Sequence, residues 1–281
     1  MNRNKRLTTY FSAIFIPLLL AILITSCGND DDAGNPGGTE RFAQETDGRV
    51  VMEAENTAFS HTLWELRNAG NPGKTGLFHS TEADLAFNGV LEGFVGSGYL
   101  EYTGEDSFRE PKDTSMFYSF RIENPGTYYL FFRAFENHTY DPDTEDREAF
   151  AGDRNNDAFV RMEGNFQANT AFSANGRYDG AAQSELENFN KLFCGSGDAA
   201  PGWGRSIALE PNDFKDPVYV FGAGETYRLY IVGRSKQLAI DRIYLIRLAD
   251  ENGNTDGENI YPFNQSRRDV EDGLYDESTF N

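Results

Sequence analysis

The chain has 281 residues, enough for one large β domain with extensions or for two small domains. Its 45 acidic residues outnumber its 25 basic ones, for a formal net charge of -20 at pH 7. This excess argues against nucleic-acid binding and against capture of an anionic polysaccharide by charge alone. The 23 Phe and 14 Tyr residues supply ample apolar surface for a core.

The first residues have the order of an export signal. A short basic region, residues 2–6, is followed by an apolar run at residues 11–24 and then by Ser26-Cys27. The apolar run is too short for a stable membrane span. This arrangement resembles a bacterial lipoprotein signal, in which Cys27 is lipidated and becomes the mature N-terminus. The sequence therefore predicts a signal peptide over residues 1–26.

Residues 27–47 are rich in Gly, Asp and Asn, which predicts a flexible tether. The acidic run Asp30–Asp32 resembles the surface-export signal of lipoproteins from Gram-negative glycan degraders, and an ordinary linker is the alternative. The resemblance implies an outer-membrane lipoprotein that faces the cell exterior. Once Cys27 is lipidated, Cys194 is the only remaining cysteine, so an intramolecular disulfide is excluded. We expect Cys194 to be a small buried residue and not a catalytic thiol.

The first predicted strand, residues 50–55, carries two carboxylates inside an apolar run. Alternate side chains share one face of a strand, so Glu53 and Glu55 point the same way with their Cα atoms about 6.5–7 Å apart. Two anions so close repel each other unless solvent or a cation separates them. A solvated strand face and a calcium site both fit this pattern.

Alternating apolar residues and Gly- or Pro-containing turns predict the other strands. Pro125-Gly126 suits the centre of a type II turn and predicts an antiparallel hairpin of residues 116–122 and 127–135. Helical periodicity is weak throughout, apart from a patch at residues 181–192. The further expected strands are 96–102, 158–163, 218–221, 226–232 and 238–247.

These elements predict an all-β protein built as an antiparallel β-sandwich over residues 48–249. Residues 165–202 form a long polar insertion in the sandwich, and residues 250–281 form an acidic tail.

The last predicted strand contains a carboxylate in an apolar setting. Strict alternation places Asp241 on the same face as Ala239 and Ile243, with Arg242 on the other face and so not its obvious partner. A carboxylate among apolar groups is costly unless it is paired or bound to a metal.

Several short motifs, in order, resemble the carbohydrate-binding modules of families 6 and 35. They comprise Glu-Ala-Glu at residues 53–55, Gly-Tyr at 98–99, Pro-Gly-x-Tyr at 125–128, Gly-Trp at 202–203, and Asp241 before an apolar run. The resemblance covers about residues 48–248 and implies a jelly-roll-like sandwich. It also implies a structural Ca²⁺ held by Glu53, Glu55 and Asp241.

A sugar ring has an apolar face and a fringe of hydroxyls, so its site needs an exposed aromatic and polar groups. The family 6 cleft uses a late Trp, which Trp203 matches, and an Asn where this chain has Ala239, so that hydrogen bond is absent. Trp203 as a cap on the core is the alternative. The candidate sugar-binding residues near loop ends are Trp203, Asn156, Asp157, His138, Tyr140, Arg234, Lys236 and Gln237.

Catalytic motifs are missing from the sequence. Glu53 and Glu55 have a spacing that fits glycoside hydrolysis, but they lie in an apolar strand. The three histidines have no metal-ligand spacing, and no nucleophile or phosphate-loop motif is present. We therefore expect no enzyme, but non-catalytic binding of a polysaccharide or oligosaccharide at the cell surface.

Such binding would support glycan capture and uptake, with a glycan transporter or glycoside hydrolases as further partners. The alternatives are a glycan-cleaving hydrolase or lyase on the same sandwich, and a surface scaffold or adhesin without a sugar ligand.

Overall fold

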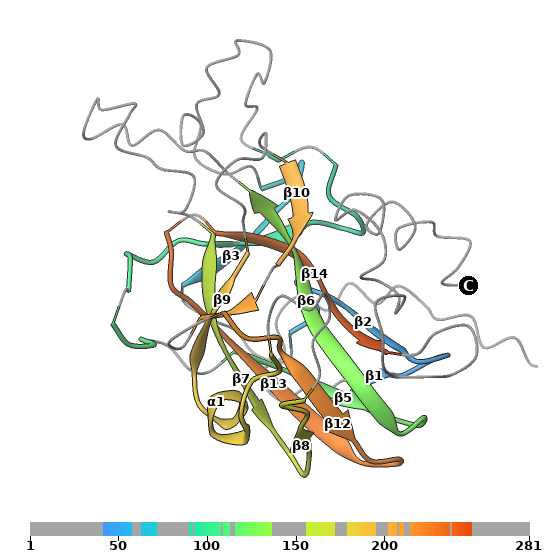
Figure 1. Ribbon diagram of the computed structural model, residues 1–281. Coiled ribbons are helices and arrows are strands. Elements are labelled where there is room, and N and C mark those ends of the chain that lie inside the picture. Colours follow the sequence, from blue (N-terminus) through green and yellow to red (C-terminus); the bar gives the residue numbers. More distant parts are fainter. Residues whose placement is uncertain are drawn as a thin grey trace, which may run out of the picture. The chain divides into compact units, whose positions relative to one another are not determined.

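The computed structural model describes most of the region between residues 42 and 248 (Figure 1). The described ranges are 42–57, 63–71, 90–91, 93–107, 109–112, 116–136, 156–171, 179–194, 202–206, 208–210, 214–236 and 238–248.

Strands dominate this part of the chain. They are β1 (Phe42–Gln44), β2 (Arg49–Glu53), β3 (Trp64–Arg67), β4 (Tyr99–Tyr102), β5 (Phe117–Arg121), β6 (Gly126–Glu136), β7 (Asp157–Glu163), β8 (Gln167–Ala168), β9 (Asn190–Phe193), β10 (Gly202–Arg205), β11 (Ala208–Leu209), β12 (Val218–Phe221), β13 (Thr226–Gly233) and β14 (Ala239–Arg247). The described helix is α1 (Gln183–Glu187), and among the described residues no helix has the length and apolar character to cross a membrane.

The strands form two sheets, which confirms the predicted all-β sandwich. One sheet has the order β1-β5-β13-β7-β9-β11, and the other has the order β3-β4-β14-β6-β12-β8. In the second sheet β2 also pairs with β14, and β10 also pairs with β6. The described neighbours are antiparallel, apart from β1, which runs parallel to β5.

Side chains from both sheets meet in one core. Phe120 and Tyr227 of the first sheet stack there at 5.6 Å between ring centroids, and Phe221 of the second sheet lies 4.4 Å from Tyr227. On β6 the alternate residues Leu130 and Phe132 point into this core. Burying so many aromatic rings supplies much of the apolar contact that holds the sheets together.

The predicted hairpin of residues 116–122 and 127–135 is wrong. Both strands exist, but β5 pairs with β1 and β13, whereas β6 lies in the other sheet. The Pro125-Gly126 turn therefore carries the chain from one sheet to the other. Glu45 holds this turn, since its carboxylate accepts hydrogen bonds from the backbone N–H groups of Glu123 and Asn124 at 3.0 and 2.7 Å.

Two elements differ in extent from their predictions. Strand β1 lies in the range that the sequence assigned to the tether, so the sheet reaches further toward the N-terminus than expected. The weak helical patch at residues 181–192 contains the five-residue helix α1 and the start of β9.

A β-bulge in β14 changes which way Asp241 points. Ile240 lies opposite Ala134, and Arg242 lies opposite Arg133, so Asp241 is the extra residue between them. Ile240 and Ile243 therefore both face the main core, and Asp241 lies on the outer side of its sheet with Arg133. The expectation that Asp241 shares a face with Ile243 is wrong because the bulge interrupts the alternation.

Candidate functional site

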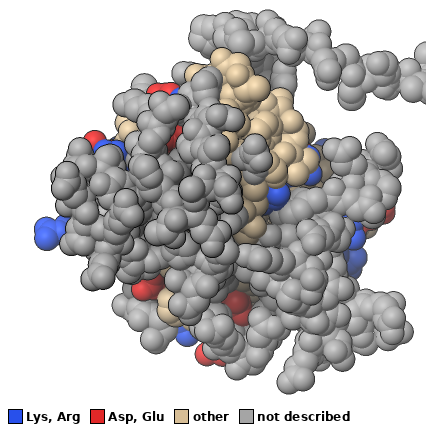
Figure 2. All heavy atoms as spheres, turned by 90° about the horizontal axis from the view of Figure 1, so that it is seen from above, with Lys and Arg blue, Asp and Glu red and all other residues tan. Residues whose placement is uncertain are grey.

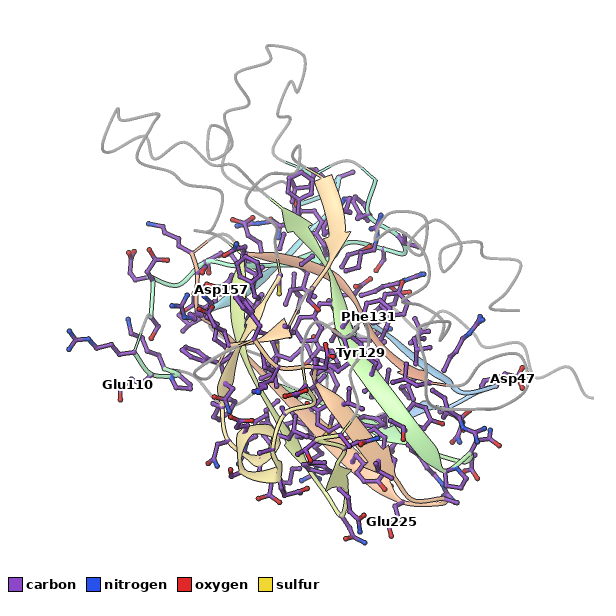
Figure 3. The ribbon with its side chains drawn as sticks, viewed as in Figure 1. Asp47, Glu110, Tyr129, Phe131, Asp157 and Glu225 are labelled. Carbon is purple, nitrogen blue, oxygen red and sulfur yellow. The ribbon has the colours of Figure 1, made fainter. Side chains whose placement is uncertain are left out.

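The outer face of the second sheet, the side turned away from the main core, is lined by aromatic rings. Phe131 of β6 stacks on Tyr244 of β14 with 4.9 Å between ring centroids and an interplanar angle of 12°, and Tyr129 follows along β6 (Figure 3). All three side chains are buried. This face therefore provides a rigid base for the residues at the end of the sheet where β10 pairs with β6.

Trp203 lies at that end, in a small aromatic cluster separate from the main core. Its ring centroid is 5.4 Å from that of Tyr99 and 5.3 Å from that of Phe135, both in edge contacts. The Arg133 guanidinium carbon lies 5.0 Å from the centroid of the indole, a cation–π distance. Trp203 is only partly buried, and Figure 2, which views the molecule from this end, shows a group of uncharged surface atoms beside basic ones.

Arg133 connects the indole to the buried Asp241. Its Nη1 forms a close ion pair with Asp241 Oδ2, and its Nη2 donates to the carbonyl oxygen of Gly93 at 2.8 Å. The backbone N–H of Val95 also donates to both Asp241 oxygens, at 3.2 and 3.1 Å. Burial raises the pKa of Asp241 to about 7 although Arg133 lowers it, so the desolvation of this carboxyl is severe.

Glu53 has a basic partner of its own. Arg242 lies opposite Glu53 in the β2–β14 pair, and its Nη2 is 2.5 Å from Glu53 Oε1. Arg242 and Asp241 thus point to the same side of β14, and a cation faces each of the two carboxylates. Glu53 and Asp241 are therefore each paired with an arginine, which the sequence did not anticipate.

The carboxylates of Glu53 and Glu55 lie close together, although β2 ends at Glu53 and the two residues do not share a strand. Both lie against the loop before β4. A Cβ built on Gly96 would be 3.0 Å from Glu53 Oε2 and 3.5 Å from Glu55 Oε1, while Ser97 donates its hydroxyl to Glu55 Oε1 at 2.7 Å. Burial raises the pKa of Glu55, and the negative charge of Glu53 raises it further, because two nearby anions disfavour each other.

This acidic pair, Glu53 and Glu55, offers some of the ligands that a hard cation needs. Glu53 Oε2 and Glu55 Oε2 are buried oxygens that accept no hydrogen bond from the described residues, and carboxylate oxygens are the ligands Ca²⁺ prefers. However, the carboxylate of Asp241, the third ligand implied by the resemblance, already pairs with Arg133 and accepts a hydrogen bond from the Val95 N–H. Within the part of the chain that the structure describes, no three His, Cys, Asp or Glu side chains gather closely enough to hold a metal ion.

Among the sugar-binding candidates, Asn156 and Asp157 are buried rather than exposed at a cleft. Asp157 is the first residue of β7 (Figure 3). Asp157 Oδ2 forms a close ion pair with Arg234 Nη1 and lies 3.3 Å from Lys191 Nζ. Burial raises the pKa of Asp157 to about 6, while Lys191 and Arg234 lower it. The structure thus brings Asp157 and Arg234 together, but as a charge cluster around a buried carboxylate.

Lys236 is partly exposed, and its Nζ lies 3.5 Å from Glu105 Oε1. His138, Tyr140, Gln237 and the lipidation residue Cys27 lie outside the described residues. Cys194 is buried and is not part of a disulfide, in line with the small apolar role expected for it.

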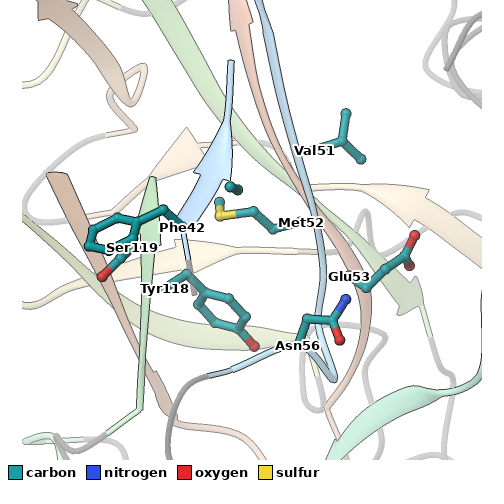
Figure 4. Close-up of a pocket in the computed structure, with 8 residues that line it drawn as sticks. Phe42, Val51, Met52, Glu53, Asn56, Tyr118 and Ser119 are labelled. Carbon is teal, nitrogen blue, oxygen red and sulfur yellow. The ribbon is translucent and has the colours of Figure 1, made fainter. Parts of the chain in front are cut away.

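A hollow of about 280 Å³ lies between β1, β2 and β5 (Figure 4). Phe42, Met52 and Tyr118 are among the residues that line it, and in the close-up Glu53 lies on the other side of β2 from Met52. Trp203 does not line this hollow, so the hollow is separate from the aromatic cluster.

Sequence reasoning missed two residues that organise the site, Arg133 and Tyr99. Arg133 was not singled out from the sequence, yet a lone cation inside the apolar strand β6 is a signal in itself, because a buried guanidinium requires an anionic partner. Tyr99 packs on Trp203 and accepts a hydrogen bond from the backbone N–H of Leu91 at 3.0 Å, which no local pattern indicates.

Comparisons with known proteins give weak structural likenesses. No family model matches the chain, and no curated protein matches it. The GH26-CBM35 β-(1,4)-mannanase of Podospora anserina is similar with a TM-score of 0.36 and 15% identity, over 73% of this chain and 29% of that chain.

A cycloisomaltooligosaccharide glucanotransferase from a Paenibacillus species, complexed with cycloisomaltoheptaose, is similar with a TM-score of 0.30 and 14% identity, over 73% of this chain and 19% of that one. The chain thus spans less than a third of the length of either structure, and likenesses of this size carry no functional argument.

Proposed function

We propose that the protein binds a polysaccharide or oligosaccharide without cleaving it, at the outer cell surface, and so supports glycan capture and uptake. The observation that carries this proposal is the setting of Trp203. Its indole is partly exposed and is held in place by Tyr99, Phe135 and Arg133. An aromatic ring fixed in this way is suited to stack on the apolar face of a sugar ring with little loss of entropy.

Three buried carboxylates form ion pairs with basic side chains, and this favours binding over catalysis. Asp241 pairs with Arg133, Asp157 pairs with Arg234 and Lys191, and Glu101 pairs with Arg67 at 2.7 Å. A general acid or base must reach the glycosidic bond, and these three carboxylates are buried and hydrogen-bonded within the protein. Their arrangement serves the fold.

A panel of purified glycans incubated with the full chain tests this proposal. Retention of a glycan on the protein without shortening of the glycan is the expected result. Shortening of the glycan would instead establish a hydrolase or lyase, and neither retention nor shortening would favour a surface scaffold or adhesin.

Trp203→Ala is expected to weaken glycan retention by about 1–3 kcal/mol, the range seen when an aromatic stacking platform is removed. Affinity chromatography or calorimetry with the retained glycan measures the loss. Phe117→Ala is a matched control, because Phe117 packs on Tyr230 and both residues belong to the first sheet, whereas Trp203 belongs to the second. An unchanged affinity in a folded Trp203→Ala protein would contradict the assignment, and a lost melting transition would make Trp203 a structural residue.

We also propose that the acidic pair, Glu53 and Glu55, is a structural Ca²⁺ site. Glu53 and Glu55 would hold the ion through their buried Oε2 atoms. Glu53 Oε2 lies against the loop at Gly96, as does the other carboxylate oxygen of Glu55. A bound Ca²⁺ neutralises the repulsion between the two carboxylates. The chain itself contributes Ser97, which orients Glu55, and Arg242, which holds the other oxygen of Glu53.

Cys27→Ala is expected to abolish lipidation, because the thiol is the acceptor of the lipid in the proposed lipoprotein signal. Labelling of cells with radioactive palmitate, followed by membrane fractionation, measures this. Ser26→Ala serves as the control, since it leaves the thiol in place. Continued labelling and membrane partition of the Cys27→Ala protein would show that the lipoprotein assignment is wrong.

A further inference from the structure

One short loop, residues 93–98, touches both Trp203 and the acidic pair. At its first residue, a Cβ on Gly93 would lie 3.6 Å from Trp203 Cδ1, so the backbone runs against the indole. Near its other end, Ser97 donates its backbone N–H and its hydroxyl to Glu55 Oε1, at 3.3 and 2.7 Å. We call residues 93–98 the bridging loop. Only a few residues of this loop therefore separate the acidic pair from Trp203.

The middle of the bridging loop is fastened to the sheet. Val95 donates its N–H to Asp241. Arg133 pairs with Asp241 through Nη1 and donates to the Gly93 carbonyl through Nη2. The same guanidinium lies 5.0 Å from the centre of the Trp203 ring. Arg133 therefore fixes the bridging loop and the indole together.

The bridging loop is short, and hydrogen bonds hold its middle to the sheet. Gly93 and Gly96 have φ angles of 80° and 77°, the left-handed region that glycine adopts readily and other residues rarely. Between these glycines the loop is held by hydrogen bonds to Asp241. When Glu55 moves, it pulls Ser97 through their hydrogen bond. Only a few residues separate Ser97 from Gly93, so the displacement reaches the backbone that lies against the Trp203 indole.

We propose that the bridging loop and Arg133 couple the acidic pair to Trp203, with Arg133 as a positioning residue for the indole. A change at the acidic pair, such as cation binding or loss of the Ser97 bond, alters how the indole is presented and hence how tightly a sugar binds. Coupling between two binding sites acts in both directions, so a bound sugar also changes the affinity of the acidic pair for its ligand. The sugar part of this inference rests on the proposed function, but the positioning of the indole does not.

Fluorescence of Trp203 tests the coupling without any ligand. The chain has two Trp residues, and Trp64→Phe leaves Trp203 as the only emitter. In that background, Arg133→Lys keeps the charge but loses the planar fork that contacts Asp241 and Gly93 together. Ser97→Ala removes one exposed hydroxyl at the far end of the bridging loop. Both are expected to raise the acrylamide quenching constant of Trp203 and to shift its emission to longer wavelength.

Ser107→Ala is the matched control, because this hydroxyl donates to the Glu110 carbonyl outside the bridging loop. It is expected to leave the Trp203 emission unchanged. With a retained glycan, Arg133→Lys and Ser97→Ala are expected to weaken affinity by about two- to thirty-fold, the range for residues that modulate coupling between sites. The control is expected to bind with the affinity of the parent chain.

Unchanged quenching and emission in folded Ser97→Ala and Arg133→Lys proteins would overturn the coupling, whether or not a glycan binds. If Arg133→Lys fails to fold, Ser97→Ala alone decides, since its side chain is exposed. Changed quenching in a chain that retains no glycan would support the coupling and refute the proposed function. Glycan binding with no change in quenching or affinity would refute the coupling and leave the proposed function standing.

Discussion

Arg133→Met is expected to lower the free energy of unfolding by about 3–5 kcal/mol, the usual cost of removing one partner of a buried ion pair. Asp241 is fully buried, and without Arg133 the described residues leave it only the Val95 N–H as a donor. The carboxyl must then be buried unpaired or take up a proton, and both cost stability at neutral pH. Urea denaturation of the parent and variant chains measures the difference.

Two further variants sharpen this measurement. Arg121→Met is the control, since Arg121 and its partner Glu123 are each about half exposed and an exposed pair contributes about 0–1 kcal/mol. The double change Arg133→Met with Asp241→Leu removes both charges and is expected to recover most of the loss, because apolar replacement of a whole buried pair is often neutral. If Arg133→Met costs no more than Arg121→Met, the ion pair does not hold the site together.

The fold was largely predictable because its strands obey local rules. Residues 158–163 and 226–232 were assigned as strands, and β7 and β13 match these ranges within one residue at each end. Alternation and turn residues act over a few neighbours, so they are visible in one sequence. The pairing of strands is set by contacts between distant residues, which is why the Pro125-Gly126 turn was mistaken for a hairpin.

The site was less predictable because a single bulge reverses the direction of a side chain. Strict alternation placed Asp241 with the core residues of β14, and the extra residue opposite Arg133 and Ala134 turned it outward instead. A bulge has no reliable local signature. The pairing of Asp241 with Arg133 joins strands more than one hundred residues apart in sequence, so it is seen only once β6 and β14 are side by side.

Sequence patterns also overestimated the exposure of polar residues near strand ends. Asn156, Asp157 and Arg234 were assigned to a sugar cleft because their residue types suit hydroxyl groups. In the structure Asp157 is buried between Arg234 and Lys191. Asn156 is buried as well, and its backbone carbonyl accepts a hydrogen bond from the Cys194 N–H at 2.6 Å. Residue type gives the chemistry that a side chain can perform, but burial decides whether a ligand can reach it.

Removal of Ca²⁺ is expected to lower the melting temperature by about 5–11 °C. A ligand that binds only the native state at a hundredfold excess over its Kd stabilises that state by about 2.7 kcal/mol. In a domain of this size, each kcal/mol corresponds to about 2–4 °C. The physical reason is the acidic pair, where two buried oxygens lack hydrogen bonds from the described residues and the charge of Glu53 raises the pKa of Glu55. Thermal melting with excess Ca²⁺ and with chelator measures the shift.

Glu55→Gln is expected to remove most of this response, since the amide keeps the shape of the side chain but removes the charge that attracts the ion. Glu105→Gln is the matched control, because Glu105 is highly exposed and pairs only loosely with Lys236 at 3.5 Å. The repulsion argument also implies that Glu55→Gln melts higher than the parent chain when chelator is present, since the neutral amide no longer opposes Glu53. Identical melting curves of the parent chain with Ca²⁺ and with chelator would show that the acidic pair is not a structural Ca²⁺ site.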